Sequence, residues 1–191
     1  MRERSDETLM AAVMAGDAAA LAALVERHHS LLLGYLYRLV GGNRPLAEDL
    51  CQETFVHLLK QQSYQIGRPF KPWLYAIATN LSRDHLKSAA VCRALRQTEQ
   101  AAELLERYDT APGPEEQALA AEQGQEIAAA LALLSEEYRA ALLLRFYHGF
   151  SLQEIAETLH VPLGTVKSHL SVGTRRLRAL LAPVQEGADC R

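Results

Sequence analysis

The stretch that determines the fold of the C-terminal part spans residues 151–181 and reads SLQEIAETLHVPLGTVKSHLSVGTRRLRALL. Ser151 and Glu154 form the pattern of a capping box, in which a hydroxyl and a carboxylate each satisfy a backbone N–H at a helix start. His160-Val161-Pro162 then makes a tight turn before a second helix. Two short helices joined by so brief a turn predict a helix-turn-helix, whose second helix can enter a DNA major groove. The side chains expected to face inward are Ile155, Ala156, Leu159, Val166, Leu170, Leu177 and Leu181.

The charge of the second helix supports this use. From Leu163 to Leu181 there are four basic residues and no acidic residue. A solvated helix face normally mixes both signs, so this bias indicates contacts with phosphate groups. Short outward side chains can in addition reach base edges or a thymine methyl group. The candidates for DNA contact are Thr165, Lys167, Ser168, Ser171, Val172, Arg175 and Arg176. Helix-turn-helix patterns also occur in helical domains that never bind DNA, so the pattern alone leaves that alternative open.

The composition excludes several classes of protein. The 191 residues are 49% hydrophobic and 23% charged, as in a globular protein, and the net charge is −3, which gives no global sign of nucleic-acid binding. No apolar run approaches the ~18–20 residues of a membrane span, and the start of the chain lacks the layout of an export signal. The three cysteines, Cys51, Cys92 and Cys190, are too far apart to suggest a disulfide framework or a zinc site. We therefore expect a cytoplasmic protein.

The middle of the chain is acidic and predicts a division into domains. Residues 88–130 contain three basic and eight acidic side chains, and Pro112-Gly113-Pro114 prevents a helix from running through. We expect a domain at 1–90, an acidic linker with some helix at 91–130, and a second domain at 131–191. The linker is most simply a solvated connector. Alternatively, it competes with a polyanion for basic surfaces or lies in a basic channel of a partner.

The fold class is all-α, because no segment alternates as a strand does and Ala and Leu outweigh β-branched residues. Helices are predicted over 18–40 and about 46–60, followed by a break at Gly67-Arg68-Pro69 and a helix with Pro72 at its first position. Together they predict a compact N-terminal helical bundle. The side chains expected to be buried in the first two helices are Leu21, Leu24, Val25, Leu31, Leu32, Leu36, Leu39, Val40, Leu46, Leu50, Cys51, Phe55, Leu58 and Leu59.

The segment 70–81, FKPWLYAIATNL, concentrates a Phe, the only Trp and a Tyr at the start of a helix. A polar stripe of Asn80, Arg83, Asp84 and Lys87 continues along it at helical spacing. Aromatic rings stack on bases, amides can read the edge of a flipped base and cations bind phosphates, so these residues could hold an unpaired strand. The alternative is that Trp73, Ile77 and Leu81 are core residues, and for Trp73 we favour it.

No set of residues indicates catalysis. The seven histidines are scattered, the adjacent pair His28-His29 points to different sides of a helix, and metalloprotease, P-loop and dinucleotide-binding motifs are absent from the sequence. A nucleophile with its base cannot be assigned from the sequence either. We therefore expect no enzymatic activity, no cofactor and no metal site.

Four stretches together resemble a family. The sequences DLCQETF (49–55), PWLYAIATN (72–80), LSEE (134–137) and VPLGTVKS (161–168) resemble, in order and separation, bacterial RNA polymerase sigma factors of the extracytoplasmic-function (ECF, group IV) type. The resemblance covers about residues 7–88 and 120–182. It implies a factor that binds core RNA polymerase, directs it to specific promoters and helps melt the −10 region.

The resemblance also implies roles for residues. The first helix motif would dock on the coiled-coil clamp of the polymerase's largest subunit, with Phe55 supporting it from the buried side. Asn80 matches a position that captures a flipped base of the −10 element, and the helix-turn-helix candidates above match contacts to the −35 element. The candidates for core-polymerase binding are Asp49, Gln52, Glu53, Val56 and Lys60. The candidates for −10 DNA binding are Trp73, Tyr75, Asn80, Arg83, Asp84 and Lys87.

Some positions depart from the family's pattern. His169, Val172 and Thr174 stand where relatives commonly have Arg, and Gly173 adds a glycine that costs about 1 kcal/mol in helix propensity. We therefore expect weak DNA affinity of the free chain and strong binding once polymerase holds both domains. The resemblance further implies an anti-sigma partner. The competing interpretations are a free-standing helix-turn-helix regulator with a sensory N-terminal domain and a small helical interaction module.

Overall fold

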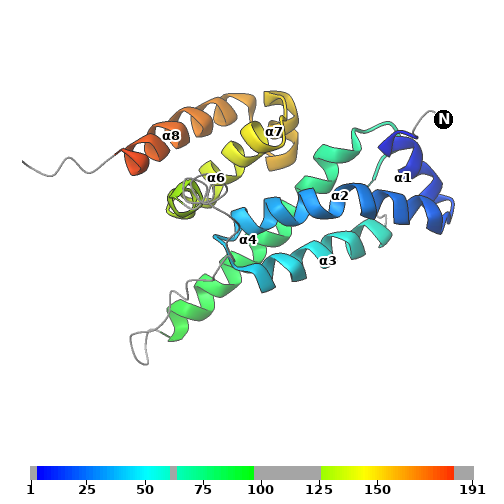
Figure 1. Cartoon of the computed structure of the whole chain (residues 1–191), viewed down its shortest axis with the longest axis horizontal. Coiled ribbons are helices and arrows are strands. Elements are labelled where there is room, and N and C mark those ends of the chain that lie inside the picture. The colour runs from blue at the N-terminus through cyan, green and yellow to red at the C-terminus, as the bar shows by residue number, and fades with distance from the viewer. Residues whose placement is uncertain (1–3, 61–63, 97–125, 183–191) are drawn as a thin grey trace, which may run out of the picture.

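The computed structural model describes residues 4–60, 64–96 and 126–182, and all regular structure in these ranges is helical. The first group of helices is α1 (Asp6–Met14), α2 (Ala18–Leu39), α3 (Arg44–Lys60) and α4 (Phe70–Arg96). The second group is α6 (Glu136–Leu142), a π-helical turn η1 (Leu143–Tyr147), α7 (Leu152–Leu159) and α8 (Leu163–Leu181), preceded by helical residues 126–132. Figure 1 shows the second group packed along one side of α2 and α4. The all-α prediction is confirmed.

The first group is a bundle around α2, whose inner face buries Leu24, Leu32, Leu36 and Leu39. Asp17 caps α2 by accepting hydrogen bonds from the backbone N–H groups of Ala19 and Ala20 (2.9 and 3.1 Å). A residue from another helix completes the start of α4. Glu7 of α1 accepts a hydrogen bond from the Phe70 N–H through Oε1 (3.2 Å), so α1 both packs on and caps α4.

Three local predictions for this bundle are wrong. Leu31 and Leu59, expected in the core, are each 51% exposed, because they lie at the edges of the apolar stripes of their helices. Pro72 is the third residue of α4 and not the first. It is tolerated there because the N–H groups of the whole first turn have no intrahelical acceptor.

The helix-turn-helix has the predicted local structure. Ser151 Oγ accepts a hydrogen bond from the Glu154 N–H (3.2 Å), and Glu154 Oε2 accepts one from the Ser151 N–H (2.7 Å). These bonds lower the pKa of the Glu154 carboxyl. His160 ends α7 in the left-handed conformation (φ 54°). Val166 is fully buried and Leu170 and Leu177 pack against the core, whereas Leu181, expected to face inward, is 40% exposed at the end of α8.

Gly173 lies where α8 crosses α6 closely. A Cβ atom added there would lie 3.2 Å from Leu142 Cδ1 and 3.3 Å from Tyr138 Cβ. The glycine is buried and allows the two helices to approach. Its cost in helix propensity is therefore offset by helix packing, which the sequence did not reveal.

Replacing Gly173 with valine is expected to lower the free energy of unfolding by about 1–3 kcal/mol, because the added methyl groups overpack the α6–α8 contact. Urea denaturation measures this difference. Gly164→Val is the matched control, since no atom lies within 4 Å of a Cβ added to Gly164 on the same helix. An equal loss of stability in both variants would contradict the packing role of Gly173.

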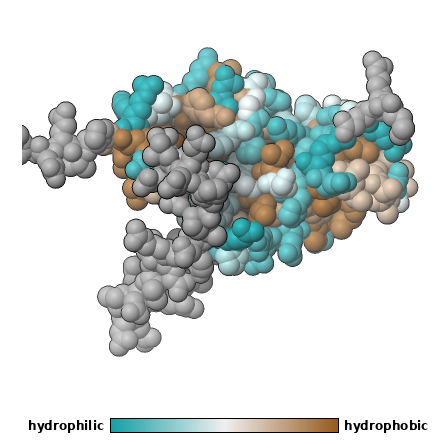
Figure 2. Space-filling model, viewed as in Figure 1, coloured by the Kyte–Doolittle hydropathy of each residue, from teal (hydrophilic) through white to brown (hydrophobic). Residues whose placement is uncertain are grey.

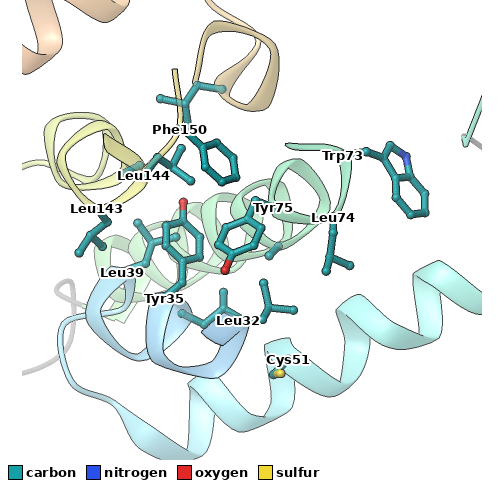
Figure 3. Packing of buried hydrophobic residues seen from close by; sticks show 14 of the residues in the cluster. Leu32, Tyr35, Leu39, Cys51, Trp73, Leu74, Tyr75, Leu143, Leu144 and Phe150 are labelled. Carbon is teal, nitrogen blue, oxygen red and sulfur yellow. The ribbon is translucent and has the colours of Figure 1, made fainter. Parts of the chain in front are cut away.

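The two groups share a core. Figure 3 shows Tyr35 of α2 and Tyr75 of α4 lying side by side, between Leu32 and Leu39 of the first group and Leu143, Leu144 and Phe150 of the second. Tyr35 and Tyr75 are at most 1% exposed. The parts predicted as separate domains thus pack against each other. Of the predicted linker at 91–130, both ends are helical in the structure, and 97–125 lie outside the described residues.

Candidate nucleic-acid interface

The outward face of α8 is the most basic of the candidate surfaces. Lys167, Ser168, Ser171, Arg175 and Arg176 are exposed, and Thr165 and Val172 are half-buried at its edges. An open groove beside it is lined by Leu170, Ser171, Thr174, Arg175 and Arg178. The first turn of α8 is held by the carbonyl of Pro162, which accepts hydrogen bonds from two following N–H groups (2.9 and 3.2 Å). This cationic helix has the shape and charge to enter a major groove.

Arg176 is partly engaged within the second group. Its guanidinium lies 5.0 Å from the centroid of the Tyr138 ring, against which the His169 ring packs edge-on at 5.4 Å. A cation–π contact of this kind is weak at an exposed site, about 0.5–1 kcal/mol. Arg176 therefore remains able to reach a phosphate, but with a smaller gain than Arg175.

Trp73 and Tyr75, predicted to contact DNA, are buried instead. Trp73 is 3% exposed and packs on the rings of Tyr64 (4.9 Å) and Phe70 (5.9 Å). Tyr75 has no exposed surface and lies against Tyr35 (5.1 Å) and the second group. Both side chains face the helix packing, so in this arrangement neither can contact DNA. The alternative that Trp73 is a core residue is correct, and it shapes α4 from inside.

The polar stripe of α4 lies on the surface. Asp84 and Lys87 are exposed, and Asn80 is half-buried. Arg83 is not free for a phosphate, because its Nε donates a hydrogen bond to Glu136 Oε2 of α6 (3.3 Å). Asn80 thus sits on a helix whose inner face is fixed by packed aromatic rings, which is the kind of rigid support that base capture requires.

The five candidate residues for core-polymerase binding lie along one exposed edge of α3, which we call the α3 edge. Asp49, Gln52, Glu53, Val56 and Lys60 are all exposed, with Val56 at 45%, whereas Phe55 is buried on the opposite side, as predicted. A groove between α3 and α4 brings together Asp49 and Glu53 with Asp84 and His85. Its three carboxylates repel phosphate, so Asp84 suits a basic protein partner better than DNA. Figure 2 shows hydrophilic and hydrophobic residues interspersed on the visible face.

His148, which no sequence motif indicated, lies between the two groups of helices. Its Nδ1 and the Tyr75 hydroxyl are 3.0 Å apart, and Lys71 Nζ donates a hydrogen bond to its backbone oxygen (3.0 Å). Its ring also contacts Tyr35 edge-on (5.4 Å). Burial, and then the cations of Lys71 and Arg38, lower the pKa of His148 to about 4. The imidazole is therefore neutral at pH 7, and its Nδ1 shares a hydrogen bond with the Tyr75 hydroxyl.

The neutral state of His148 predicts a pH dependence. Because the pKa of His148 is lower in the packed structure than its ordinary value of 6.5, the unfolded chain binds more protons between pH 6.5 and 4. The free energy of unfolding is expected to be constant above pH 6.5 and to fall below it, by less than about 1.4 kcal/mol per pH unit from this one group. Denaturation at pH 7.0, 5.5 and 4.5 measures the slope. His148→Gln keeps an acceptor without the titration, and an unchanged slope in that variant would contradict the assignment.

Within the described ranges, no group of His, Cys, Asp or Glu side chains is arranged to hold a metal ion. None of the helices described is long and apolar enough to cross a membrane.

Comparisons with known proteins match both groups of helices. The family model for sigma-70 region 2 matches residues 24–91, and the model for sigma-70 region 4 matches residues 124–177. The chain is 38% identical over 190 residues to the ECF RNA polymerase sigma factor SigE of Mycolicibacterium smegmatis, covering 94% of this chain and 70% of that protein. It is 33% identical over 174 residues to the ECF sigma factor SigW of Bacillus subtilis, covering 88% and 92%.

Solved structures give the same fold. CnrH in complex with the cytosolic domain of CnrY is similar with a TM-score of 0.67 at 25% identity, covering 92% of this chain and 96% of that chain. The sigma factor RpoE of Bartonella quintana, in complex with the anti-sigma factor NepR, has a TM-score of 0.65 at 23% identity, covering 84% and 96%. The second likeness concerns the fold alone.

Proposed function

This chain belongs to the family of ECF RNA polymerase sigma factors, which direct RNA polymerase to promoters, and from this premise we propose how its surfaces divide the work. The edge of α3 docks on core polymerase, the stripe of α4 captures the −10 element, and α8 reads the −35 element. The observation that carries this proposal is that the three sets lie on three different helices: the α3 set is exposed, the α8 set is exposed or half-buried, and of the α4 stripe Lys87 is exposed and Asn80 half-buried. One chain can then bind the enzyme and two DNA elements at once.

The −35 element is bound as duplex DNA, and α8 inserts into its major groove. Lys167, Arg175 and Arg176 take phosphates, while Ser168, Ser171 and Val172 reach base edges. The free chain binds this element weakly, because His169, Val172 and Thr174 supply no guanidinium. Binding becomes strong when polymerase holds both domains, since the second contact is then intramolecular.

For the −10 element, Asn80 reads an unpaired base and Lys87 takes a neighbouring phosphate, whereas Arg83 is held by Glu136. Melting requires that captured bases offset a stacking free energy of about 1–2 kcal/mol per step. Asp84 faces the groove shared with Asp49 and Glu53, so we assign it to the polymerase side rather than to DNA.

The chain is not an enzyme, and the chemistry of RNA synthesis belongs to the polymerase. We propose that it acts in the cytoplasm, where it meets polymerase and promoter DNA. We also propose an anti-sigma factor as a regulatory partner, because the resemblance to the family implies one and the similar CnrH structure is a complex with the cytosolic domain of a second protein, CnrY. The free-standing regulator considered above explains only the second group of helices and leaves the exposed α3 edge without a role.

A transcription assay tests the proposal. Core polymerase from the source bacterium is incubated with genomic promoter fragments, with and without this chain. New promoter-specific transcripts are expected only with the chain. Glu53→Lys, which reverses a charge on the α3 edge, is expected to abolish holoenzyme formation. Glu26→Lys, an equal change at an exposed site of α2, is the control and should leave it intact. If polymerase alone makes the same transcripts, the proposal is wrong.

A further inference from the structure

We propose that Tyr138 of α6 is a positioning residue for the −35 element, because its ring holds the Arg176 guanidinium of α8 in the place from which it binds a DNA phosphate. The inference rests on the assignment of α8 to the −35 element and deepens it, since it names how one phosphate contact of that helix is prepared. Tyr138 acts through Arg176 and need not contact DNA itself.

The Tyr138 side chain packs across α8 at Gly173. A Cβ atom added to Gly173 would lie 3.3 Å from Tyr138 Cβ, so the glycine allows the tyrosine to approach the helix. His169 precedes Gly173 by about one helical turn and Arg176 follows it by about one turn, so both fall on the face that Tyr138 contacts. The Tyr138 ring meets the His169 ring edge-on (5.4 Å) and lies beneath the Arg176 guanidinium (5.0 Å).

Two positions that depart from the family's pattern belong to this contact. Gly173 admits the Tyr138 side chain, and the His169 ring supports the Tyr138 ring. An arginine at position 169 would instead bring a second cation to the ring that already holds Arg176, and like charges repel. The sequence of α8 has therefore lost guanidinium groups, but it keeps Arg176 in a defined place beside its partner ring.

Holding Arg176 in place matters because its side chain is long and exposed. An arginine that is ordered only on binding loses side-chain freedom, which weakens binding by about two- to tenfold. A ring contacts the flat face of a guanidinium, whereas the N–H donors lie in its plane and can still bind a phosphate. Arg176 can therefore bind while it stays on the ring, and the smaller gain described above applies only to an Arg176 that leaves it.

The neighbouring arginine lacks this support. Among the described residues, the cations that lie over aromatic rings are those of Arg38, Lys71 and Arg176. Arg175 is exposed beside the open groove of α8. The two adjacent arginines thus offer an internal comparison, because only one of them depends on Tyr138.

Methylphosphonate linkages, which carry no charge, locate the phosphate that Arg176 contacts. Holoenzyme is assembled with the full chain on a promoter fragment that it transcribes, and each phosphate of the −35 element is replaced in turn. Wild-type holoenzyme is expected to lose about tenfold in affinity when the phosphate bound by Arg176 is replaced. Arg176→Gln should bind the native fragment about as weakly, and should not respond to replacement of that phosphate.

Tyr138→Leu removes the ring and keeps an apolar side chain beside Gly173. It is expected to weaken binding of the native fragment by about two- to tenfold, and to reduce the response at the Arg176 phosphate by the same factor. Combined with Arg176→Gln it should cause no further loss, whereas combined with Arg175→Gln its effect should be additive. Tyr138→Phe keeps the ring and should bind like the wild type. Tyr147→Leu is the matched control, because the ring of Tyr147 lies beneath Arg38 of α2 and not beneath an α8 residue.

A second variant pair does not depend on how well Tyr138→Leu folds. His169→Phe keeps an aromatic contact with Tyr138 and should bind like the wild type, whereas His169→Ala should weaken binding and reduce the response at the same phosphate. If His169→Phe binds as weakly as His169→Ala, His169 does not act by supporting the ring and that part of the inference is wrong.

The outcomes separate this inference from the proposed function. If Tyr138→Leu weakens the wild type and Arg176→Gln by the same factor, Tyr138 has only a structural role and the inference is overturned. If neither the methylphosphonates nor Arg175→Gln affect wild-type binding, α8 does not bind the −35 element, and the proposed function itself fails.

Discussion

Replacing Asn80 with alanine is expected to reduce promoter opening by about 10- to 100-fold without changing the affinity for core polymerase. The amide is the only neutral side chain of the α4 stripe that can both donate to and accept from the edge of an unpaired base. Loss of such a contact to a captured base costs about 1–3 kcal/mol, which corresponds to this range. Permanganate reactivity of −10 thymines in the holoenzyme complex measures the opening.

Two controls separate base capture from a structural effect. Glu26→Ala changes an exposed residue of α2, outside the three candidate surfaces, and should leave opening unchanged. A template with a mismatched, already open −10 region should restore much of the activity of Asn80→Ala, because the melting step is then bypassed. If Asn80→Ala opens the duplex normally, Asn80 does not capture a base, and the role of α4 must be assigned to other residues.

Local signals predicted much of the fold. Three of these signals act over only a few residues, and each is followed by the expected structure. They are the capping box at Ser151 and Glu154, the turn ending in Pro162, and the pattern of charged and apolar residues in 163–181. The same is true of Phe55 on the inner side of α3. Helical periodicity reports which face of a helix is apolar, and this information is present in the sequence itself.

Contacts between distant segments left no such signal. Tyr75, predicted to contact DNA, is buried by the approach of His148 and Phe150. An aromatic side chain with a hydroxyl suits either setting, so the residue type could not reveal this. Gly173 was predicted only to lower helix propensity, because its packing partners, Tyr138 and Leu142, belong to another helix. Arg83 looked available because Glu136 lies 53 residues away. Each error concerns the packing of one helix on another.

Replacing Arg139 with methionine is expected to lower the free energy of unfolding by about 3–5 kcal/mol, because three backbone carbonyls would lose their donor inside the protein. The Arg139 guanidinium is 9% exposed and donates to the oxygens of Leu39 (2.6 Å), Ala132 (2.7 Å) and Leu134 (2.7 Å). Burial lowers its pKa, which still leaves it charged at neutral pH. Urea denaturation of the full chain measures the loss.

Arg145→Met is the matched control, because Arg145 is exposed and its one described hydrogen bond is to the Phe150 carbonyl, so its loss should cost no more than about 1 kcal/mol. Arg139→Lys tests the geometry, since a single ammonium cannot replace a planar fork that serves carbonyls on two sides. One acceptor, the Leu39 oxygen, ends α2 in the other group of helices. Arg139→Met should therefore also increase the radius of gyration of the free chain, measured by small-angle X-ray scattering at urea concentrations too low to unfold it. A variant that loses stability yet stays compact would contradict a role of the contact with the Leu39 oxygen in holding the two groups of helices together.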